Sequence, residues 1–477
     1  MTWTVGTSGD ACEAQSAQAG SHAHPSFVLV TSILASSLAF VDGSVVNVGL
    51  PAIGSGFHAS AADLQWVINA YLLPLSALLL LGGGAGDRYG QRRILVLGAL
   101  LFGICSAVCA AAPNLPLLLA ARAGQGTGAA LILPNSLSIL GSAFSGAARG
   151  RAVGTWSAAS SMAAAVGPVL GGALIDSFGW RAIFLINIPL VVATIVFAVL
   201  FVREPPRPKG QAPLDGWGGL LATLALLALT WGLTAGSGRT GWSPSAIGAI
   251  AVGVLLVPVF LWVERRKKSA AIMPLFLFNS RAFIGLTVFT FLLYGALGAL
   301  LVLVPYVLID GARYSGTMAG AALLPFPIVI VLTSRALGGL AGRIGSRLPL
   351  TIGPLIVAAG FLLLLRIGPG MAYWADVLPA IILISFGMAG AVSPLTIAVL
   401  GSVDAGHTGS ASGLNSAAAR TGGLVATALL GGVLAAKGSA LFSAFHIAAL
   451  VCAATCVVAS LSVPASLDAR AEGRMRK

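Results

Sequence analysis

Charged residues are scarce in this sequence. They account for 9% of the 477 residues, whereas 57% are hydrophobic; soluble domains carry about 25% charged residues. A water-soluble fold is therefore excluded. In place of charge, the sequence has a succession of apolar runs of about 20 residues, the length at which a helix crosses a hydrocarbon core about 30 Å thick. The chain is predicted to be an all-α polytopic membrane protein.

The residue clusters that support catalysis or ATP hydrolysis are missing as well. No group of His, Cys and carboxylate residues forms an enzyme site, and there is no Walker-type phosphate loop. We therefore expect no enzyme, no metal site and no cofactor. Two cysteine pairs with a spacing of four, Cys105 with Cys109 and Cys452 with Cys456, are interpreted as small buried packing residues. His446, in the last apolar run, is interpreted as a packed or hydrogen-bonded histidine.

Fourteen membrane spans are predicted. They cover residues 27–53, 63–84, 94–112, 115–140, 152–176, 182–202, 216–236, 244–264, 282–309, 318–336, 348–367, 374–399, 409–435 and 439–463. The polar segment before the first span contains no Lys or Arg, so it does not have the basic region of a cleaved signal peptide. We interpret it as a disordered tail.

Basic residues lie mostly on one side of this topology. With the N-terminus inside, 20 of the 27 Lys and Arg residues fall in cytoplasmic loops and the C-terminal tail, five fall outside and two lie within spans. Because Lys and Arg are retained on the cytoplasmic side, both termini are predicted to be cytoplasmic, in a bacterial cytoplasmic membrane. Topology and anionic lipid thus explain the net charge of +13, and no nucleic acid is expected as a partner.

The sequence contains an internal repeat. Two sets of residues recur 255 positions later: Gly83, Arg88, Gly90 and Arg92 as Gly338, Arg343, Gly345 and Arg347, and Gly154 and Gly167 as Gly409 and Gly422. Each match shifts the chain by eight spans, which predicts two six-helix bundles separated by two extra spans, a plan that is common in transporters. The predicted organisation is a cytoplasmic tail (1–26), an N-terminal bundle (27–202), a linker (203–281) that holds the extra spans 216–236 and 244–264, a C-terminal bundle (282–463) and a basic cytoplasmic tail (464–477).

Several motifs resemble those of a known family. "GGAGDRYGQRR", residues 83–93, is similar to the loop signature of the major facilitator superfamily, G-x-x-x-D-R-x-G-x-R/K-R/K, and "LAARAGQGTGAA", residues 119–130, is similar to its fourth-helix motif. "GPVLGG", residues 167–172, resembles the fifth-helix signature of its proton-coupled exporters. Together with "DGSVVNVGLP", "WRAIFLINIP" and "ASGLNSAAARTGG", these motifs narrow the resemblance to the fourteen-helix drug:proton antiporter family. The resemblance implies the major facilitator fold with two extra central helices.

The loop signature predicts a cytoplasmic gate, formed by Gly83, Asp87, Arg88, Gly90 and Arg92. The glycines allow a tight turn between two helices, and Asp87 near a helix end can pair with Arg88 or another nearby base. The second copy of the signature has no acid at the equivalent position, so the predicted latch is one-sided. The alternative is that these charges only set the topology.

The motif "GPVLGG" predicts a helix that seals one side of a cavity. Pro168 removes a backbone donor, while Gly167, Gly171 and Gly172 let a neighbouring helix come close. In the resemblance, this packing prevents leak and so favours exchange. The alternative is ordinary packing of small residues.

One acid is predicted to lie deep in the membrane. Asp42 is inside the first span, and every other acid is in a tail, a loop or a span end. Arg122 lies in the fourth span at a depth that differs by roughly 6 Å, at 1.5 Å per residue, so a direct or water-bridged contact is predicted. Burial favours the neutral carboxyl and a nearby cation favours the ionised one, so movement of Arg122 would switch Asp42 between binding and releasing a proton. The alternative is a static structural ion pair.

The predicted function is a proton-coupled multidrug or small-molecule efflux antiporter that works by alternating access and confers antibiotic resistance. It is driven by the proton gradient, without a cofactor, and acts as a monomer on small amphipathic substrates. Residues predicted to face the substrate cavity are Asn47, Trp66, Asn69, Tyr71, Gln125, Asn135 and Arg420, although packing also explains the aromatic ones. The alternative is a proton symporter or uniporter for a metabolite; the repeat disfavours a channel.

Overall fold

The computed structural model describes residues 25–144, 146–204, 215–237, 241–267, 273, 275–403 and 408–463. Within these ranges the chain is helical and contains no strand. The predictions for the two terminal tails lie almost entirely outside the described residues.

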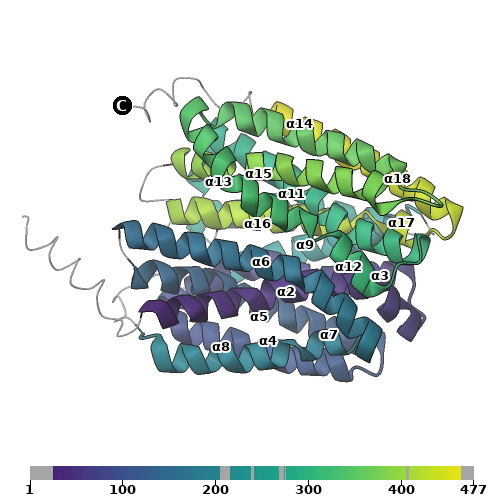
Figure 1. Ribbon diagram of the computed structural model, residues 1–477. Helices are drawn as coiled ribbons and strands as arrows, with labels where there is room; N and C mark the ends of the chain where they lie inside the picture. Colours follow the sequence, from purple (N-terminus) through teal and green to yellow (C-terminus); the bar gives the residue numbers. More distant parts are fainter. Residues whose placement is uncertain are drawn as a thin grey trace, which may run out of the picture.

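The helices of the first half form one bundle in the lower part of Figure 1. They are α2 (Pro25–Phe57), α3 (Ala61–Tyr89), α4 (Gln91–Ala111), α5 (Leu115–Ala143), α6 (Gly146–Phe178), α7 (Ala182–Leu185) and α8 (Asn187–Phe201). Because α7 and α8 follow one another with little interruption, they correspond to a single predicted span, the sixth.

The helices of the second half form a bundle in the upper part of the same view. They are α11 (Arg281–Tyr306), η3 (Val307–Gly311), α12 (Gly316–Ala322), α13 (Pro325–Ile344), α14 (Arg347–Leu363), η4 (Leu364–Arg366), η5 (Tyr373–Val377), α15 (Leu378–Gly401), α16 (Thr408–Ala428), α17 (Gly431–Ala435) and α18 (Ser439–Ser462). A short helix, η2 (Leu275–Asn279), precedes them.

The repeat of 255 positions is visible in the backbone. Ser60 caps the start of α3 by accepting a hydrogen bond from the Asp63 amide, and Ser315, at the equivalent position, caps α12 in the same way. Gly90 and Gly345 both adopt a positive φ, 107° and 85°, in the turns that follow α3 and α13. Positive φ favours glycine because it has no Cβ, so the matched glycines of the loop signature serve matched turns. The structure therefore agrees with a duplicated fold.

Helices α9 (Gly216–Ser237) and α10 (Pro244–Lys267) connect the bundles and pack against each other, and α9 also contacts α3 and α16. Twelve helical segments of the described chain, α9 and α10 among them, are long and apolar enough to cross a membrane. Helix α5 is not in that group, and in α6 a shorter apolar segment, Met162–Phe178, was found among the described residues. The number of fourteen crossings and the domain boundaries stay predictions.

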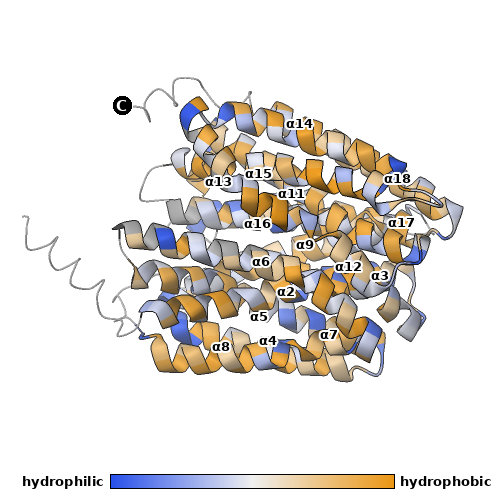
Figure 2. Ribbon diagram, viewed as in Figure 1, coloured by the Kyte–Doolittle hydropathy of each residue, from blue (hydrophilic) through white to orange (hydrophobic). Residues whose placement is uncertain are grey.

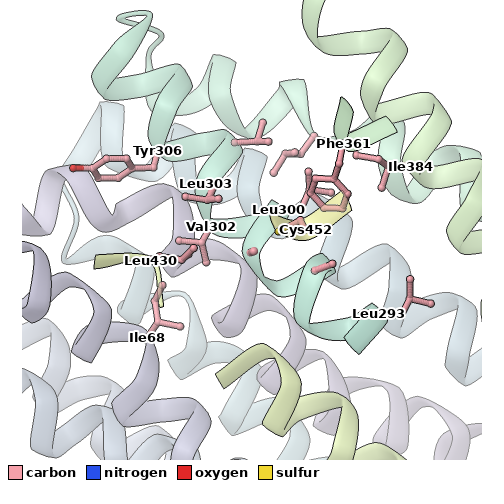
Figure 3. Close-up of a cluster of buried hydrophobic side chains, with 14 of the residues drawn as sticks. Ile68, Leu293, Leu300, Val302, Leu303, Tyr306, Phe361, Ile384, Leu430 and Cys452 are labelled. Carbon is pink, nitrogen blue, oxygen red and sulfur yellow. The ribbon is translucent and has the colours of Figure 1, made fainter. Parts of the chain in front are cut away.

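Apolar side chains cover the bundle and fill its interior. Hydrophobic residues run along most of the helices in Figure 2, and on α10 many of them are exposed, with Leu255 66% accessible, as expected for a surface that faces lipid. One buried cluster crosses from one half to the other. Figure 3 shows part of it, with Leu300 and Leu303 of α11, Phe361 of α14 and Ile68 of α3.

Hydrogen bonds join the two halves at one end of the molecule. We call the end with the turns at Gly90 and Gly345, where most arginines lie, the basic end, and the end with loops 58–60 and 312–315 the far end. At the far end Gln65 Nε2 of α3 donates to the Thr427 carbonyl of α16 (2.9 Å). Asp176 of α6 accepts a hydrogen bond from the Thr317 amide of α12 (2.9 Å). The far end is therefore closed.

Glycines on α6 show how the distance between α6 and the opposing helices of the second half changes along α6. A Cβ on Gly172 would lie 2.2 Å from the Gly316 carbonyl oxygen of α12, whereas a Cβ on Gly154, nearer the basic end, would meet no described atom within 4 Å. On the opposing helices, Gly320 is equally tight against the Pro168 carbonyl (2.2 Å) and Gly339 is open. On this side of the molecule, the space between α6 and the opposing helices α12 and α13 thus widens toward the basic end.

Candidate functional site

An ion pair lies in the middle of the first bundle. Arg122 of α5 donates from Nη1 to Asp42 Oδ2 of α2 at 2.5 Å, and both residues are only 1% accessible. The structure thus has the direct contact that was predicted from the depths of the two residues. A charge in this position is costly unless it is paired, and each group supplies the other's counter-ion.

Three further side chains complete a polar network around the carboxylate. Asn187 at the start of α8 donates to Asp42 Oδ1 (2.9 Å), and Gln125, one turn along α5 from Arg122, donates to the same oxygen (3.2 Å). Both amides also donate to the Ser106 hydroxyl of α4, at 3.3 and 2.7 Å. The network joins four helices of one half and gives both oxygens of the Asp42 carboxylate hydrogen-bond donors.

Sequence analysis missed Asn187 and Ser106. Asn187 lies inside the quoted "WRAIFLINIP" stretch, and its amide is the polar group that enters an otherwise apolar run there. That isolation was a usable signal, because polar side chains inside a span usually face a partner. Ser106 gave no comparable signal, since serine is common at helix contacts.

Tyr71 separates the ion pair from the centre of the molecule. The Arg122 guanidinium carbon lies 4.4 Å from the centroid of the Tyr71 ring, a cation–π distance, and the Tyr71 hydroxyl donates to the Ala39 carbonyl (3.1 Å). Tyr71 and Arg122 both line a central cavity of about 230 Å³. Asp42 is not among the residues that line this cavity, so Arg122 and Tyr71 lie between its carboxylate and the cavity.

Both halves build this central cavity. Its polar lining is Asn47, Tyr71, Arg122, Tyr294, Arg420 and Thr427. A second cavity of about 200 Å³ shares Asn47, Leu297 and Leu301 with it and extends between α6 and α13. Both are mostly apolar, which is typical of sites for small amphipathic ligands.

The predicted cavity residues divide into two groups. Asn47, Tyr71 and Arg420 line the central cavity, whereas Trp66 and Asn69 are not among its lining residues. Asn69 is fully buried, and neither polar atom of its side chain has a partner in the described part of the chain.

Gln125 and Asn135 are corrections to that prediction, because the structure places both on other faces of α5. Gln125 belongs to the network around Asp42, between helices of one half. Asn135 donates to the Gly82 carbonyl of α3 (2.9 Å) and packs so closely on Gly86 that a Cβ there would lie 1.5 Å from Asn135 Oδ1. Helical spacing alone did not say which face of α5 meets the cavity.

The loop signature forms a polar cluster at the basic end. Asp87 accepts a hydrogen bond from Gln91 (3.4 Å), while Arg92 donates to the Val202 carbonyl (3.1 Å) and pairs with Glu204 at 3.9 Å. Glu204, just beyond α8, was not selected from the sequence. Gly90 approaches the Glu204 carboxylate so closely that a Cβ would lie 2.4 Å from it. The acid of this cluster that pairs with Arg92 is thus Glu204.

The "GPVLGG" segment packs α6 tightly against two helices. A Cβ on Gly167 would lie 2.1 Å from Ser44 Oγ of α2, and one on Gly171 would lie 2.8 Å from Val45 Cγ1. Gly172 and Pro168 form the close contacts with α12 described above. The predicted close approach is present, and it occurs both within one half and between the halves. Whether it prevents leak is a matter for experiment.

Two sequence-based interpretations of lone residues agree with the structure. His446 Nε2 lies 2.8 Å from the Ile367 carbonyl, so it is a hydrogen-bonded histidine. Cys109, Cys452 and Cys456 are buried packing residues, and Cys105 is half-buried. No group of three metal-binding side chains occurs among the described residues.

Comparisons with known proteins agree on the family. The sequence profile of the Major Facilitator Superfamily matches residues 32–427. The chain is 32% identical over 419 residues to "Multidrug resistance protein Stp" of Mycobacterium tuberculosis, covering 86% of this chain and 76% of that protein. It is also 32% identical to "Methylenomycin A resistance protein" of Bacillus subtilis, with coverage of 85% and 87%.

Solved structures show the same fold at low sequence identity. A peptide transporter, POT, in complex with sulfate superimposes with a TM-score of 0.68 at 15% identity, covering 94% of this chain and 97% of that one. The described chain is all-helical, with two bundles and a cavity between them, and the family profile covers most of its length. These findings agree with the family that the sequence motifs indicated. This chain belongs to the major facilitator superfamily.

Proposed function

We propose that this protein is a proton-coupled antiporter that exports small amphipathic molecules. The observation that carries the proposal is the buried ion pair of Asp42 and Arg122, in which Arg122 lines a cavity between the two halves and Asp42 lies behind it. The names of similar proteins, among them "Multidrug efflux pump LfrA" of Mycolicibacterium smegmatis, support export of drugs. Proton symport or uniport of a metabolite is the alternative, and flux direction separates the two.

In the proposed cycle, Asp42 is the proton site. With Arg122 bound, the carboxylate is ionised; when Arg122 turns toward the cavity, burial favours the neutral form and Asp42 takes up a proton. Each charge that moves across the membrane contributes about 2.3 kcal/mol per 100 mV. The protein needs no cofactor for this step and acts as a monomer, since one chain supplies both halves.

The basic end faces the cytoplasm in this proposal, because Lys and Arg are retained there. The protein then lies in the cytoplasmic membrane with both termini inside, and the structure corresponds to a state open to the cytoplasm. Glycine contacts between α6 and α12 close the outer side. Alternating access requires these contacts to separate while the cluster around Arg92 and Glu204 comes together with the second half.

The experiment has two stages. A panel of amphipathic antibiotics and dyes is first screened for efflux in a bacterial host that lacks its own pumps. Everted vesicles with an imposed pH gradient are then given an accepted compound, and we expect proton release through the wild type and none through Asp42→Asn. Asp42→Glu should retain part of the coupling. Uphill, proton-dependent export by Asp42→Asn at normal rate would show that the carrier of the proton is another group.

A further inference from the structure

A second arginine faces the central cavity and has no counter-ion among the residues that the structure describes. Arg420, on α16, lines the cavity together with Tyr71, Tyr294 and Thr427. Over the described ranges it forms no ion pair, and none of the hydrogen bonds found there involves its guanidinium. This distinguishes it from Arg122, which bonds to the Val67 carbonyl, to Gln125 and to Asp42.

No carboxylate of the described chain is available to Arg420. Asp42 is saturated, since Arg122 occupies one oxygen and two amides occupy the other. Asp87 lies at the basic end and Asp176 at the far end, where Asp176 already accepts hydrogen bonds from α12. An intramembrane cation is costly and normally has a partner. Arg420 therefore needs a negative charge that the described chain does not supply.

We propose that the transported molecule supplies it: Arg420 is an anion subsite, and the substrates are amphipathic molecules that carry an acidic group such as a carboxylate, a phenolate or a sulfonate. The inference rests on the proposed transport function and names the substrate class. A guanidinium offers a planar fork of donors that matches such groups in two parallel hydrogen bonds. The Tyr294 hydroxyl, in the same cavity, can serve as a further donor.

The walls of the cavity fit the rest of such a molecule. Leu297, Leu301 and Val302 of α11 line it opposite Ile68 and Leu72 of α3, so an apolar body can be buried while its acidic group meets Arg420. The arrangement disfavours cations, because the described residues give the cavity two arginines and no acid. If one monoanion leaves the cell for each proton that enters, the net movement is two positive charges inward per cycle. The membrane potential, negative inside, would then drive both steps.

The first test is binding, which does not depend on proton coupling. Purified full-length protein in lipid nanodiscs is titrated with fluorescein, an anionic xanthene dye, and with a cationic rhodamine ester of similar size and ring system. We expect the wild type to bind fluorescein more tightly. Arg420→Gln should weaken fluorescein binding by on the order of 10- to 100-fold, the range expected for charge-assisted hydrogen bonds, and leave the rhodamine ester unchanged or bound more tightly.

Two control variants separate charge from shape. Arg420→Lys keeps the charge without the fork and should lose less affinity for fluorescein than Arg420→Gln does, while Asn47→Ala removes an uncharged polar group of the same cavity and should affect both dyes alike. Preference of the wild type for the rhodamine ester, no binding of fluorescein, or equal weakening of both dyes by Arg420→Gln would overturn the proposal. Because this titration measures binding without a pH gradient, failure of proton coupling in vesicles and failure of this subsite give different results.

Discussion

The two halves of the molecule share a backbone plan and differ in the chemistry of their interiors. Each member of the network around Asp42 has an apolar counterpart 255 positions later: Leu297 for Asp42, Val377 for Arg122, Ala380 for Gln125, Phe442 for Asn187 and Phe361 for Ser106. The second bundle nevertheless repeats the helix order, with a matched helix cap at Ser315 and a matched positive-φ turn at Gly345. The scaffold therefore does not need a polar network in order to form.

The difference also runs in the other direction. Arg420 and Tyr294 of the second half correspond to Ala165 and Ala39 in the first. The first half thus holds a paired, buried charge and the second contributes an unpaired charge to the cavity. Buried ion pairs contribute little net stability compared with well-packed apolar residues, so the presence of Asp42 and Arg122 in one half only supports the role in transport that we propose for them.

The largest effect on stability and transport is expected when residues of the polar network in the first half are replaced by the apolar residues found at the equivalent positions of the second half. Asp42→Leu leaves Arg122 buried without its carboxylate, which should lower the free energy of unfolding by about 3 to 5 kcal/mol. Addition of Arg122→Val should restore most of that stability, because Gln125 and Asn187 keep their hydrogen bonds to Ser106. Neither variant should transport. Thermal unfolding in detergent together with vesicle transport checks both statements, and a double variant as unstable as the single one would mean that the pair is structural.

A smaller effect on stability and exchange is expected from alanine substitutions at two glycines of α6, one packed against α12 and one in open space. Gly172→Ala places a Cβ 2.2 Å from the Gly316 carbonyl, so the closed far end should be destabilised by about 1 to 3 kcal/mol and exchange should slow. Gly154→Ala is the matched control, because it has open space in this state. Exchange rates in vesicles and cysteine accessibility at the far end measure the outcome. Equal effects of the two variants would argue against a sealing contact at Gly172.

The smallest effect is expected at the surface of the far end. Lys437, between α17 and α18, donates to Asp310 (2.8 Å), and this hydrogen bond raises the pKa of the Lys437 ammonium. A raised pKa means that the contribution to stability is complete below the ordinary lysine value of about 10.4 and is lost as the pH rises through the folded value. The contribution is small because Lys437 is largely exposed. We therefore expect the melting temperature of the wild type to fall slightly as the pH rises into the alkaline range. Lys437→Met should remove this fall, and an unchanged fall would assign it to another group.

Much of the molecule could be predicted from its residues because the governing effects are local. Span positions follow from apolar length, and the ion pair follows from the depth of two intramembrane charges, which the structure joins at 2.5 Å. The duplicated plan follows from matched glycines, which the structure places in matched turns at Gly90 and Gly345. The polar partners of Asp42 were only partly predictable, because Asn187 and Ser106 come from helices distant in sequence.

The sequence by itself determined the membrane class, the repeat and the identity of the one deep acid, since hydrophobic length and the cost of an intramembrane charge depend on residue type alone. Tertiary structure decided which face of each helix meets the cavity. In lipid both faces of a helix are apolar, so no hydrophobic stripe marks the inner one. For this reason only the packed helices place Gln125 beside Asp42, Asn135 against Gly82 and Gly86, and Arg420 in the cavity without a carboxylate among the described residues.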